Sequence, residues 1–253
     1  MVKKILIFII AYKASFRLRD VFNEIPHKKL KEYNISFLIS DDSSKDDTID
    51  FAKKIKNQNK DKRIYLNENK KNIGYGANIK KCLKFSLKKN YDYAVMIHGD
   101  GQYSPKYIPN LLKRLVKNPG ISACTGSRVF NGPKSALRGG MPFYKLIGNI
   151  FLTKIFNILL KKKYTDTHTG LWAYNMFNLK DKKFIRLTNS FNFDQEFRFL
   201  NILKKKEIDE IAIRTKYGDE RSQLHINYAV SFLLRSLIFF LIKNKIINSS
   251  KYR

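Results

Sequence analysis

Short apolar runs alternate with amphipathic segments through the first half of the chain. The apolar runs are continuous and of strand length, as expected of strands buried on both faces of a parallel sheet. They lie at Lys4–Ile10, Ile35–Ser40, Arg63–Leu66, Tyr91–Ile97 and Ile121–Thr125. The segments between them predict helices at Ser15–Tyr33, Thr48–Asn59, Ile79–Lys89 and from Pro105 to about Lys117. This alternation predicts the α/β class, with an open, mostly parallel sheet flanked by helices.

The second half of the chain carries two long apolar segments and a late strand. The segments are Met141–Leu160 and Ile226–Ile247, and the strand is expected near Glu210–Thr215. Crossing a bilayer takes about 20 predominantly apolar residues, and basic residues interrupt both segments. Each is therefore expected either to lie in a membrane interface or to be buried on its own domain. We predict one domain over residues 1–222 and a basic, apolar, amphipathic C-terminal helix over residues 223–253.

Basic residues outnumber acidic ones by a wide margin. The chain has 50 Lys and Arg against 21 Asp and Glu, which gives a formal net charge of +29. Such a balance favours an anionic partner: nucleic acid, an acidic membrane face or a phosphorylated substrate. Lys is abundant throughout the chain, however, so compositional drift accounts for part of the excess. The two isolated cysteines, Cys82 and Cys124, argue against a disulfide framework and fit a reducing compartment.

Acidic residues follow two of the predicted strands. Asp41 and Asp42 follow the second strand, and Asp100 follows the fourth, between Gly99 and Gly101. The carboxyl ends of parallel strands form the ligand-binding edge of such a sheet. Carboxylates there would repel bare phosphate, so a divalent cation has to bridge the two. The sequence therefore predicts a metal–diphosphate site at this edge.

Five segments match, in order, the motifs of one enzyme family. They are Ser40–Thr48 (S-D-D-S-S-K-D-D-T), Asn72–Asn78 (N-I-G-Y-G-A-N), His98–Gln102 (H-G-D-G-Q), Gly126–Arg128 (G-S-R) and Asp166–Gly170 (D-T-H-T-G). As a set they resemble family 2 glycosyltransferases with the GT-A fold, whose motifs read V-D-D-G-S-x-D-G-T, N-x-G-x-G, D-x-D-x-Q, G-[ST]-R and D-x-x-x-G. The chain looks most like the dolichol-phosphate mannose synthase branch and bacterial polyprenyl-phosphate sugar transferases.

The resemblance implies a role for each matching residue. The residues that would bind the nucleotide-sugar donor are Tyr12, Asp41, Asp42, Gly74, Gly76, Asn78 and Asp100. The residues that would hold Mg²⁺ or Mn²⁺ on the diphosphate are Asp100, His98 and Gln102. The residues that would act on phosphate, transferred sugar or acceptor are Arg128, Arg138, Asp166, Asp194 and Glu196. For the two arginines this means bidentate donation to phosphate.

Several positions depart from the family pattern. His98 stands where the family has its first metal-site aspartate, and an imidazole ligand tilts the preference towards Mn²⁺. Ala14 stands where the family has the glutamate of its first loop, Ser43 and Asp47 replace two glycines, and Trp172 lies where a phosphate-reading arginine is common. These changes affect the prediction of the donor's identity more than that of the reaction class.

Each candidate residue also has a purely structural interpretation. Asp41 and Asp42 could be helix caps, and His98 could be a packed histidine at a strand end. Asp194 and Glu196 fit an ordinary helix N-terminus, and the two candidate arginines could be surface charges. Only the joint occurrence of the motifs favours a site.

We expect transfer from a UDP- or GDP-sugar to polyprenyl phosphate, with inversion implied only by the resemblance. A phosphate oxygen is already anionic and needs no general base. The basic, apolar segments Met141–Lys163 and Ile226–Lys245 would rest on an anionic bilayer. This predicts a cytoplasmic enzyme, peripheral on the inner face of the membrane. The alternative is transfer to a sugar hydroxyl in cell-surface polysaccharide or lipopolysaccharide synthesis, which needs Asp194, Glu196 or Asp166 as a base.

Two interpretations of other classes stand beside the enzyme. A basic nucleic-acid-binding protein is disfavoured because the sequence has no recognition signature and its strand-end acids would repel a phosphate backbone. We therefore expect no nucleic-acid partner. A catalytically inactive relative stays open because of His98 and Trp172.

Overall fold

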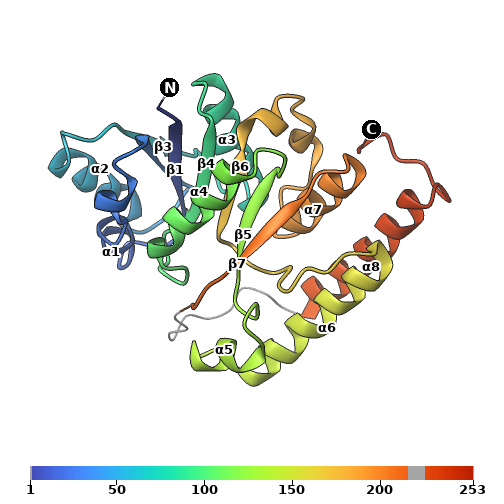
Figure 1. The fold of residues 1–253 in the computed structure, drawn as a ribbon. Coiled ribbons are helices and arrows are strands. Elements are labelled where there is room, and N and C mark those ends of the chain that lie inside the picture. The colour runs from blue at the N-terminus through green and yellow to red at the C-terminus, as the bar shows by residue number, and fades with distance from the viewer. Residues whose placement is uncertain (1, 216–225, 253) are drawn as a thin grey trace.

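The protein is described by a computed structural model that covers residues 2–215 and 226–252. These residues form one sheet with helices on both faces (Figure 1). The predicted domain boundary between residues 222 and 223 lies outside the described residues.

The sheet has seven strands among the described residues, in the order β3-β2-β1-β4-β6-β5-β7. They are β1 (Lys4–Ala11), β2 (Asn34–Asp41), β3 (Ile64–Glu68), β4 (Tyr93–His98), β5 (Ala123–Ser127), β6 (Trp172–Asn175) and β7 (Ile208–Ala212). Every pairing is parallel except the two that β6 makes with β4 and β5. The predicted α/β class and mostly parallel sheet are confirmed.

Helices cover both faces of this sheet. They are α1 (Leu18–Asn23), α2 (Thr48–Gln58), α3 (Tyr75–Lys88), α4 (Ile108–Lys117), α5 (Pro133–Arg138), α6 (Phe143–Leu160), α7 (Phe193–Leu203) and α8 (Ile226–Lys243). Short 3₁₀ segments are η1 (His27–Leu30), η2 (Pro105–Tyr107), η3 (Met176–Leu179) and η4 (Lys183–Arg186). Helices α1, α2 and α4 pack on one face, and α3, α6, α7 and α8 pack on the other.

Strand β1 shows why the apolar runs are continuous. Its residues Leu6 and Phe8 belong to the core under α3 and α7, whereas Ile7 and Ile9 belong to the core under α1 and α4. Successive side chains of a strand point to opposite faces, so a strand covered on both faces needs apolar residues at every position.

The largest differences from the predicted elements concern one helix, the late strand and β6. The helix expected at Ser15–Tyr33 is split into α1 and η1, because Pro26 lies between them and lacks the N–H that a continuous helix needs. The late strand spans Ile208–Ala212 rather than Glu210–Thr215. Strand β6 was not predicted, since a run of four residues carries too little periodicity to be recognised.

Trp172 begins β6 and is a core residue. Its ring is fully buried, and its Nε1 donates to the Thr169 carbonyl at 2.9 Å. The guanidinium of Arg198 lies 4.7 Å from the ring. In this chain, the tryptophan that replaces the family's arginine at this position therefore packs in the core.

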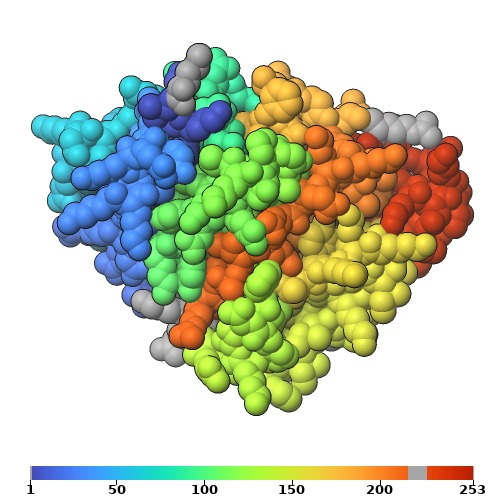
Figure 2. Space-filling model, in the orientation of Figure 1, coloured from blue at the N-terminus to red at the C-terminus, as the bar shows by residue number. Residues whose placement is uncertain are grey.

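The C-terminal helix α8 is part of the hydrophobic core, where Phe232 and Phe239 are buried. It packs along α6, and the two helices adjoin at one flank of the molecule (Figures 1 and 2). Both also expose apolar side chains: Phe143, Tyr144, Ile147, Phe151 and Ile158 on α6, and Val230, Leu234, Leu237 and Ile238 on α8. We call these side chains the α6–α8 apolar surface.

Among the described residues, α6 alone is long and apolar enough to cross a membrane. The same helix donates a hydrogen bond from Asn149 to Asp166 and joins Thr153 to Thr167. Spanning a bilayer would remove α6 from these buried contacts. The helix therefore belongs to the folded domain.

Gly76 permits the close approach of α3 to the segment that precedes α7. Its N–H donates to the Asn189 carbonyl at 2.8 Å. A Cβ added at Gly76 would lie 2.5 Å from the Thr188 oxygen and 2.8 Å from the Phe193 Cβ. Only glycine allows this backbone contact, which sets α7 beside α3.

We expect Gly76→Ala to lower the free energy of unfolding by about 2 kcal/mol, because backbone and core atoms must move to admit the methyl group. Urea denaturation measures the change. Gly120→Ala is the matched control, since a Cβ there meets nothing within 4 Å. Equal effects of the two substitutions would contradict the packing argument.

Candidate active site

A pocket of about 560 Å³ opens at the carboxyl ends of β1, β2 and β4. This is the sheet edge predicted to bind ligands. Segments far apart in the sequence line it: Tyr12, Asp42, Asn78, Asp100, Asp194 and Tyr228. The pocket therefore gathers side chains from near both ends of the chain.

Asp42 holds one wall of this pocket in place. Its Oδ1 accepts hydrogen bonds from Asn69 Nδ2 and the Ile73 N–H, both at 2.9 Å, and its Oδ2 accepts from the Gly74 N–H at 3.0 Å. The carboxylate thereby fixes the glycine turn that opens α3. Gly74 has a φ of +90°, which favours glycine.

The other predicted donor-binding residues divide into two groups. Tyr12, Gly74 and Asn78 line the pocket with Asp42. Asp41 does not, because its two oxygens accept hydrogen bonds from the N–H and hydroxyl of Ser44. Gly76 also lies outside the pocket, where it serves the packing of α3.

Asp100 and His98 form the predicted metal corner. Asp100 Oδ2 lies 3.9 Å from His98 Nδ1, and its Oδ1 accepts from the Gln102 N–H at 3.0 Å. Burial acts to raise the pKa of Asp100, but the His98 ring and the backbone N–H outweigh it, so the pKa lies below its ordinary value. The carboxylate is therefore ionised at neutral pH.

These residues supply only part of a cation's coordination. No group of three or more His, Cys, Asp or Glu that could hold a metal occurs among the described residues. One carboxylate and the Nδ1 of His98 still fit a cation that completes its shell with diphosphate oxygens and water, as Mg²⁺ commonly does. The other nitrogen, Nε2, is covered, because a Cβ on Gly170 would lie 2.5 Å from it.

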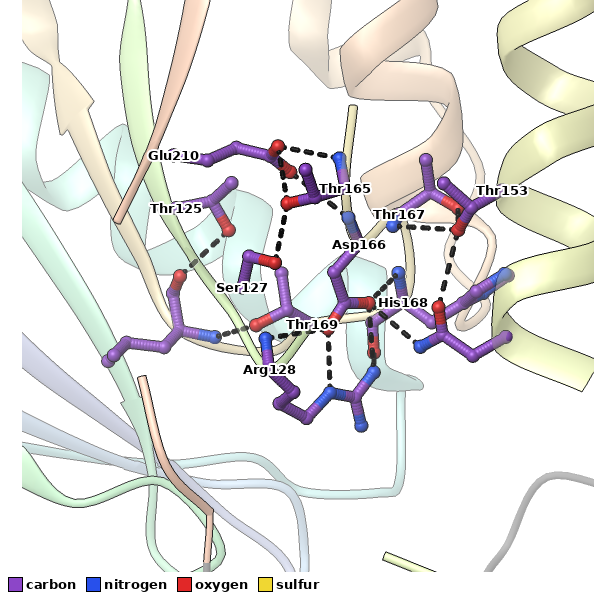
Figure 3. A network of polar contacts seen from close by, with 12 residues as sticks. Thr125, Ser127, Arg128, Thr153, Thr165, Asp166, Thr167, His168, Thr169 and Glu210 are labelled. Carbon is purple, nitrogen blue, oxygen red and sulfur yellow. Dashed lines mark hydrogen bonds and ion pairs between the residues drawn. The ribbon is translucent and has the colours of Figure 1, made fainter. Parts of the chain in front are cut away.

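Asp166 lies in a buried polar network beside the pocket (Figure 3). Arg128 holds it with two hydrogen bonds, Nε to Oδ2 at 2.7 Å and Nη2 to Oδ1 at 3.0 Å. Asn149 Nδ2 and the His168 N–H also donate to Oδ1. Burial would raise the pKa of Asp166, but the Arg128 cation reverses this and holds the pKa well below its usual range.

Asp166, Arg128 and Arg138 do not take the places expected of them. Asp166 was expected to face the transferred sugar, but it does not line the pocket and both its oxygens are engaged. The guanidinium of Arg128 hydrogen-bonds to both Asp166 oxygens, and Arg128 does not line the pocket. Arg138 is exposed on α5 and also lies outside the pocket.

Asp194 is the acidic residue that α7 presents to the pocket. Its Oδ2 accepts a hydrogen bond from the Tyr75 hydroxyl at 2.8 Å, and its Oδ1 has no partner among the described residues. Burial raises the pKa of this carboxyl to about 7, although the Tyr75 hydrogen bond acts to lower it. Asp194 thus has the position and the pKa of a proton acceptor.

Glu196 lies on the opposite side of α7 and does not line the pocket. It is fully buried and accepts ion pairs from Arg235 and from Lys251, the latter at 2.7 Å. It also accepts from the Thr188 N–H at 2.8 Å. Its contacts join α8 and the C-terminal segment to α7, which corrects the expectation that it faces sugar or acceptor.

Tyr75, His168 and Tyr228 line the pocket although they were not among the predicted site residues. His168 Nδ1 lies 3.2 Å from the Tyr228 hydroxyl, and its ring packs 4.5 Å from that of Phe232. Burial lowers the pKa of His168 to about 3, so the ring is neutral. Only the D-x-x-x-G motif around His168 gave a signal that this segment reaches the site.

Comparison with known proteins identifies the family. The model of Glycosyl transferase family 2 matches residues 6–181. The chain belongs to this family. A family 2 glycosyltransferase is an enzyme that takes its sugar from a nucleotide sugar, which agrees with the pocket at the sheet edge.

Two curated relatives of this glycosyltransferase align over most of its length. An uncharacterized protein of Methanocaldococcus jannaschii is 31% identical over 205 residues, covering 76% of this chain and 82% of its own. UDP-N-acetylglucosamine–dolichyl-phosphate N-acetylglucosaminyltransferase of Methanococcus voltae is 25% identical over 256 residues, covering 97% of this chain and 99% of its own.

Solved structures show the fold. Glucosyl-3-phosphoglycerate synthase from Mycobacterium tuberculosis, in complex with Mn²⁺, UDP and phosphoglyceric acid, matches with a TM-score of 0.60 at 14% identity. The match covers 98% of this chain and 80% of that one. The same synthase has also been solved with Mg²⁺ and UDP. The predicted GT-A fold of this family 2 glycosyltransferase is confirmed.

Proposed function

We propose that this glycosyltransferase moves a sugar from a UDP- or GDP-sugar to a polyprenyl phosphate, with help from a divalent cation. The observation that carries the proposal is the ionised Asp100 in a pocket at the carboxyl ends of the strands, which Asp42 and Asp194 also line. The relative from Methanococcus voltae, which acts on dolichyl phosphate, supports the acceptor class. Its donor makes UDP-N-acetylglucosamine the first sugar nucleotide to test.

The pocket residues divide the work along the donor. Tyr12, Asp42 and Asn78 would bind the nucleoside end, where Asp42 fixes the wall through the Ile73 and Gly74 N–H groups. Asp100 with His98 would hold Mg²⁺ or Mn²⁺, which supplies Lewis-acid stabilisation to the leaving diphosphate. Sugar and acceptor would then occupy the side of the pocket lined by Asp194 and Tyr228.

We expect Asp100→Asn to lower the transfer rate at least about 100-fold, because the negative charge that retains the cation is lost. The measurements are Mn²⁺-dependent binding of nucleotide sugars by thermal shift and transfer with each bound sugar, with and without a chelator. Asp61→Asn is the control, since that carboxylate is exposed and pairs only with Lys62 among the described residues. Wild-type binding without transfer to any acceptor would indicate an inactive relative.

The acceptor proposal also draws on the α6–α8 apolar surface. Helices α6 and α8 contain no Asp or Glu, and Lys145 and Lys154 accompany the apolar side chains of α6, whereas Arg235 of α8 pairs with Glu196 and Lys243 donates to the Leu160 carbonyl. Basic charge beside exposed apolar groups suits an anionic lipid surface, which is where a polyprenyl phosphate resides. We therefore propose a cytoplasmic enzyme that is peripheral on the inner face of the membrane.

We expect Phe151→Glu or Leu234→Glu to weaken binding to phosphatidylglycerol vesicles at least about tenfold, because each removes an apolar contact and adds a negative charge. Vesicle sedimentation measures the partition. Phe177→Glu is the matched control, since Phe177 is also exposed but lies on η3. The surface is not the docking site if the three variants bind alike.

A second acceptor class is favoured by one observation. Asp194 is buried in the pocket with a pKa of about 7 and an oxygen that no described residue engages. Such a carboxyl suits a general base for a sugar hydroxyl, whereas phosphate needs none. Transfer to a sugar hydroxyl in surface polysaccharide or lipopolysaccharide synthesis is therefore the second candidate function.

Asp194→Asn separates the two acceptor classes. With polyprenyl phosphate we expect kcat to stay within about tenfold of wild type, because no proton has to be removed from the acceptor. With a hydroxyl acceptor the loss should be about 100-fold to 10,000-fold. Initial rates at saturating donor, measured with both acceptors, distinguish these outcomes. A large loss of kcat with polyprenyl phosphate would contradict the first proposal.

A further inference from the structure

Two aromatic rings pack against the ring of Tyr75, which lines the pocket. Tyr75 is the first residue of α3, directly after Gly74, and its ring stacks on Phe191 with centroids 5.2 Å apart. The His98 ring meets it edge-on at 5.6 Å. With both neighbours in place, the ring has little freedom to turn away from the pocket.

The same packing fixes the distance between Tyr75 and Asp194. Gly76 hydrogen-bonds to Asn189, and neither Gly74 nor Gly76 has space for a Cβ beside the 188–189 backbone. That backbone leads directly into α7, whose second residue is Asp194. Tyr75 and Asp194 therefore belong to one rigid unit. The packing of α3 against the segment before α7 holds their side chains at the 2.8 Å of a hydrogen bond.

The hydrogen bond leaves Asp194 with one oxygen to offer. Tyr75 occupies Oδ2, while Oδ1 is buried and has no partner among the described residues. A buried acceptor without a partner is unfavourable, so a ligand that donates a hydrogen bond to it gains affinity. A nucleotide sugar brings hydroxyl donors of the kind that this oxygen lacks.

We propose that Tyr75 is a positioning residue, whose hydroxyl fixes the Asp194 carboxyl so that Oδ1 accepts a hydrogen bond from a hydroxyl of the donor's sugar. This inference rests on the proposed function, because it requires a nucleotide-sugar donor. If so, the Tyr75–Asp194 pair makes the protein bind a sugar nucleotide more tightly than the bare nucleotide. Neither side chain of the pair hydrogen-bonds to Tyr12 or Asp42, which are proposed to bind the nucleoside, so binding of the bare nucleotide should change little.

The experiment compares the affinity of UDP-N-acetylglucosamine with that of UDP by titration calorimetry in Mn²⁺. We expect Tyr75→Phe, which removes one oxygen, to reduce the ratio of the two affinities about fivefold, the effect of one hydrogen bond. The Kd of UDP itself should stay within about twofold. In steady-state assays, KM for the sugar nucleotide should rise by a similar factor, with kcat nearly unchanged.

Two further variants complete the design. Asp194→Asn should reduce the same ratio, and the double variant should lose no more than the larger single loss, because the two groups act as a unit. Tyr65→Phe is the control: Tyr65 is a partly buried tyrosine of β3 that packs on Phe85, outside the pocket, and its loss of a hydroxyl should leave the ratio unchanged.

Distinct results would overturn the inference. If Tyr75→Phe weakens the binding of UDP and of the sugar nucleotide equally, Tyr75 has a general structural role. If it leaves both affinities unchanged, Tyr75 has no role in donor binding. Strictly additive losses in the double variant would separate Tyr75 from Asp194. A wild-type protein that binds neither UDP nor any UDP- or GDP-sugar would overturn the proposed function as well.

Discussion

The buried carboxylate of Asp166 is the charge on which the second half of the molecule depends. Arg128 neutralises it from the end of β5, and Asn149 donates to it from α6. Arg198 of α7 donates to the backbone carbonyl of the same residue, at 2.9 Å. Three elements thus meet at one residue of a loop. Leaving a buried charge without its partner typically costs about 3–5 kcal/mol, so these elements are obliged to keep their relative positions.

Much of the first half could be predicted because a single physical pattern dominates it. Strands covered on both faces must be apolar throughout, and the residues that follow them meet at one edge. The positions of Asp42 and Asp100 after two such strands were therefore enough to predict that they share a site, and both line the pocket. Strand β6 lacks that signal, since its place is set by the loop that Asp166 anchors rather than by its own four residues.

The candidate acids of the second half could not be ranked by residue type. Asp194 and Glu196 are two positions apart on one helix, which turns them about 200° from each other, so only one can face the pocket. Which one does depends on the contact of α3 with the segment before α7, a packing event that spacing does not reveal. Asp166 had the right motif. Its carboxylate is buried, however, and is neutralised by Arg128, so it is a structural anchor and does not face the pocket.

The pocket draws on the chain from Tyr12 near the start to Tyr228 on α8. The glycine turn beside Asp42 packs against the 188–189 backbone, so this wall of the pocket also needs the second half of the chain. The His168–Tyr228 wall forms only when α8 has packed on α6. Removing α8 would take Tyr228 from the pocket and Phe232 and Phe239 from the core. Docking of α8 and closure of the pocket are therefore one event, because the same helix fills the core with Phe232 and lines the pocket with Tyr228.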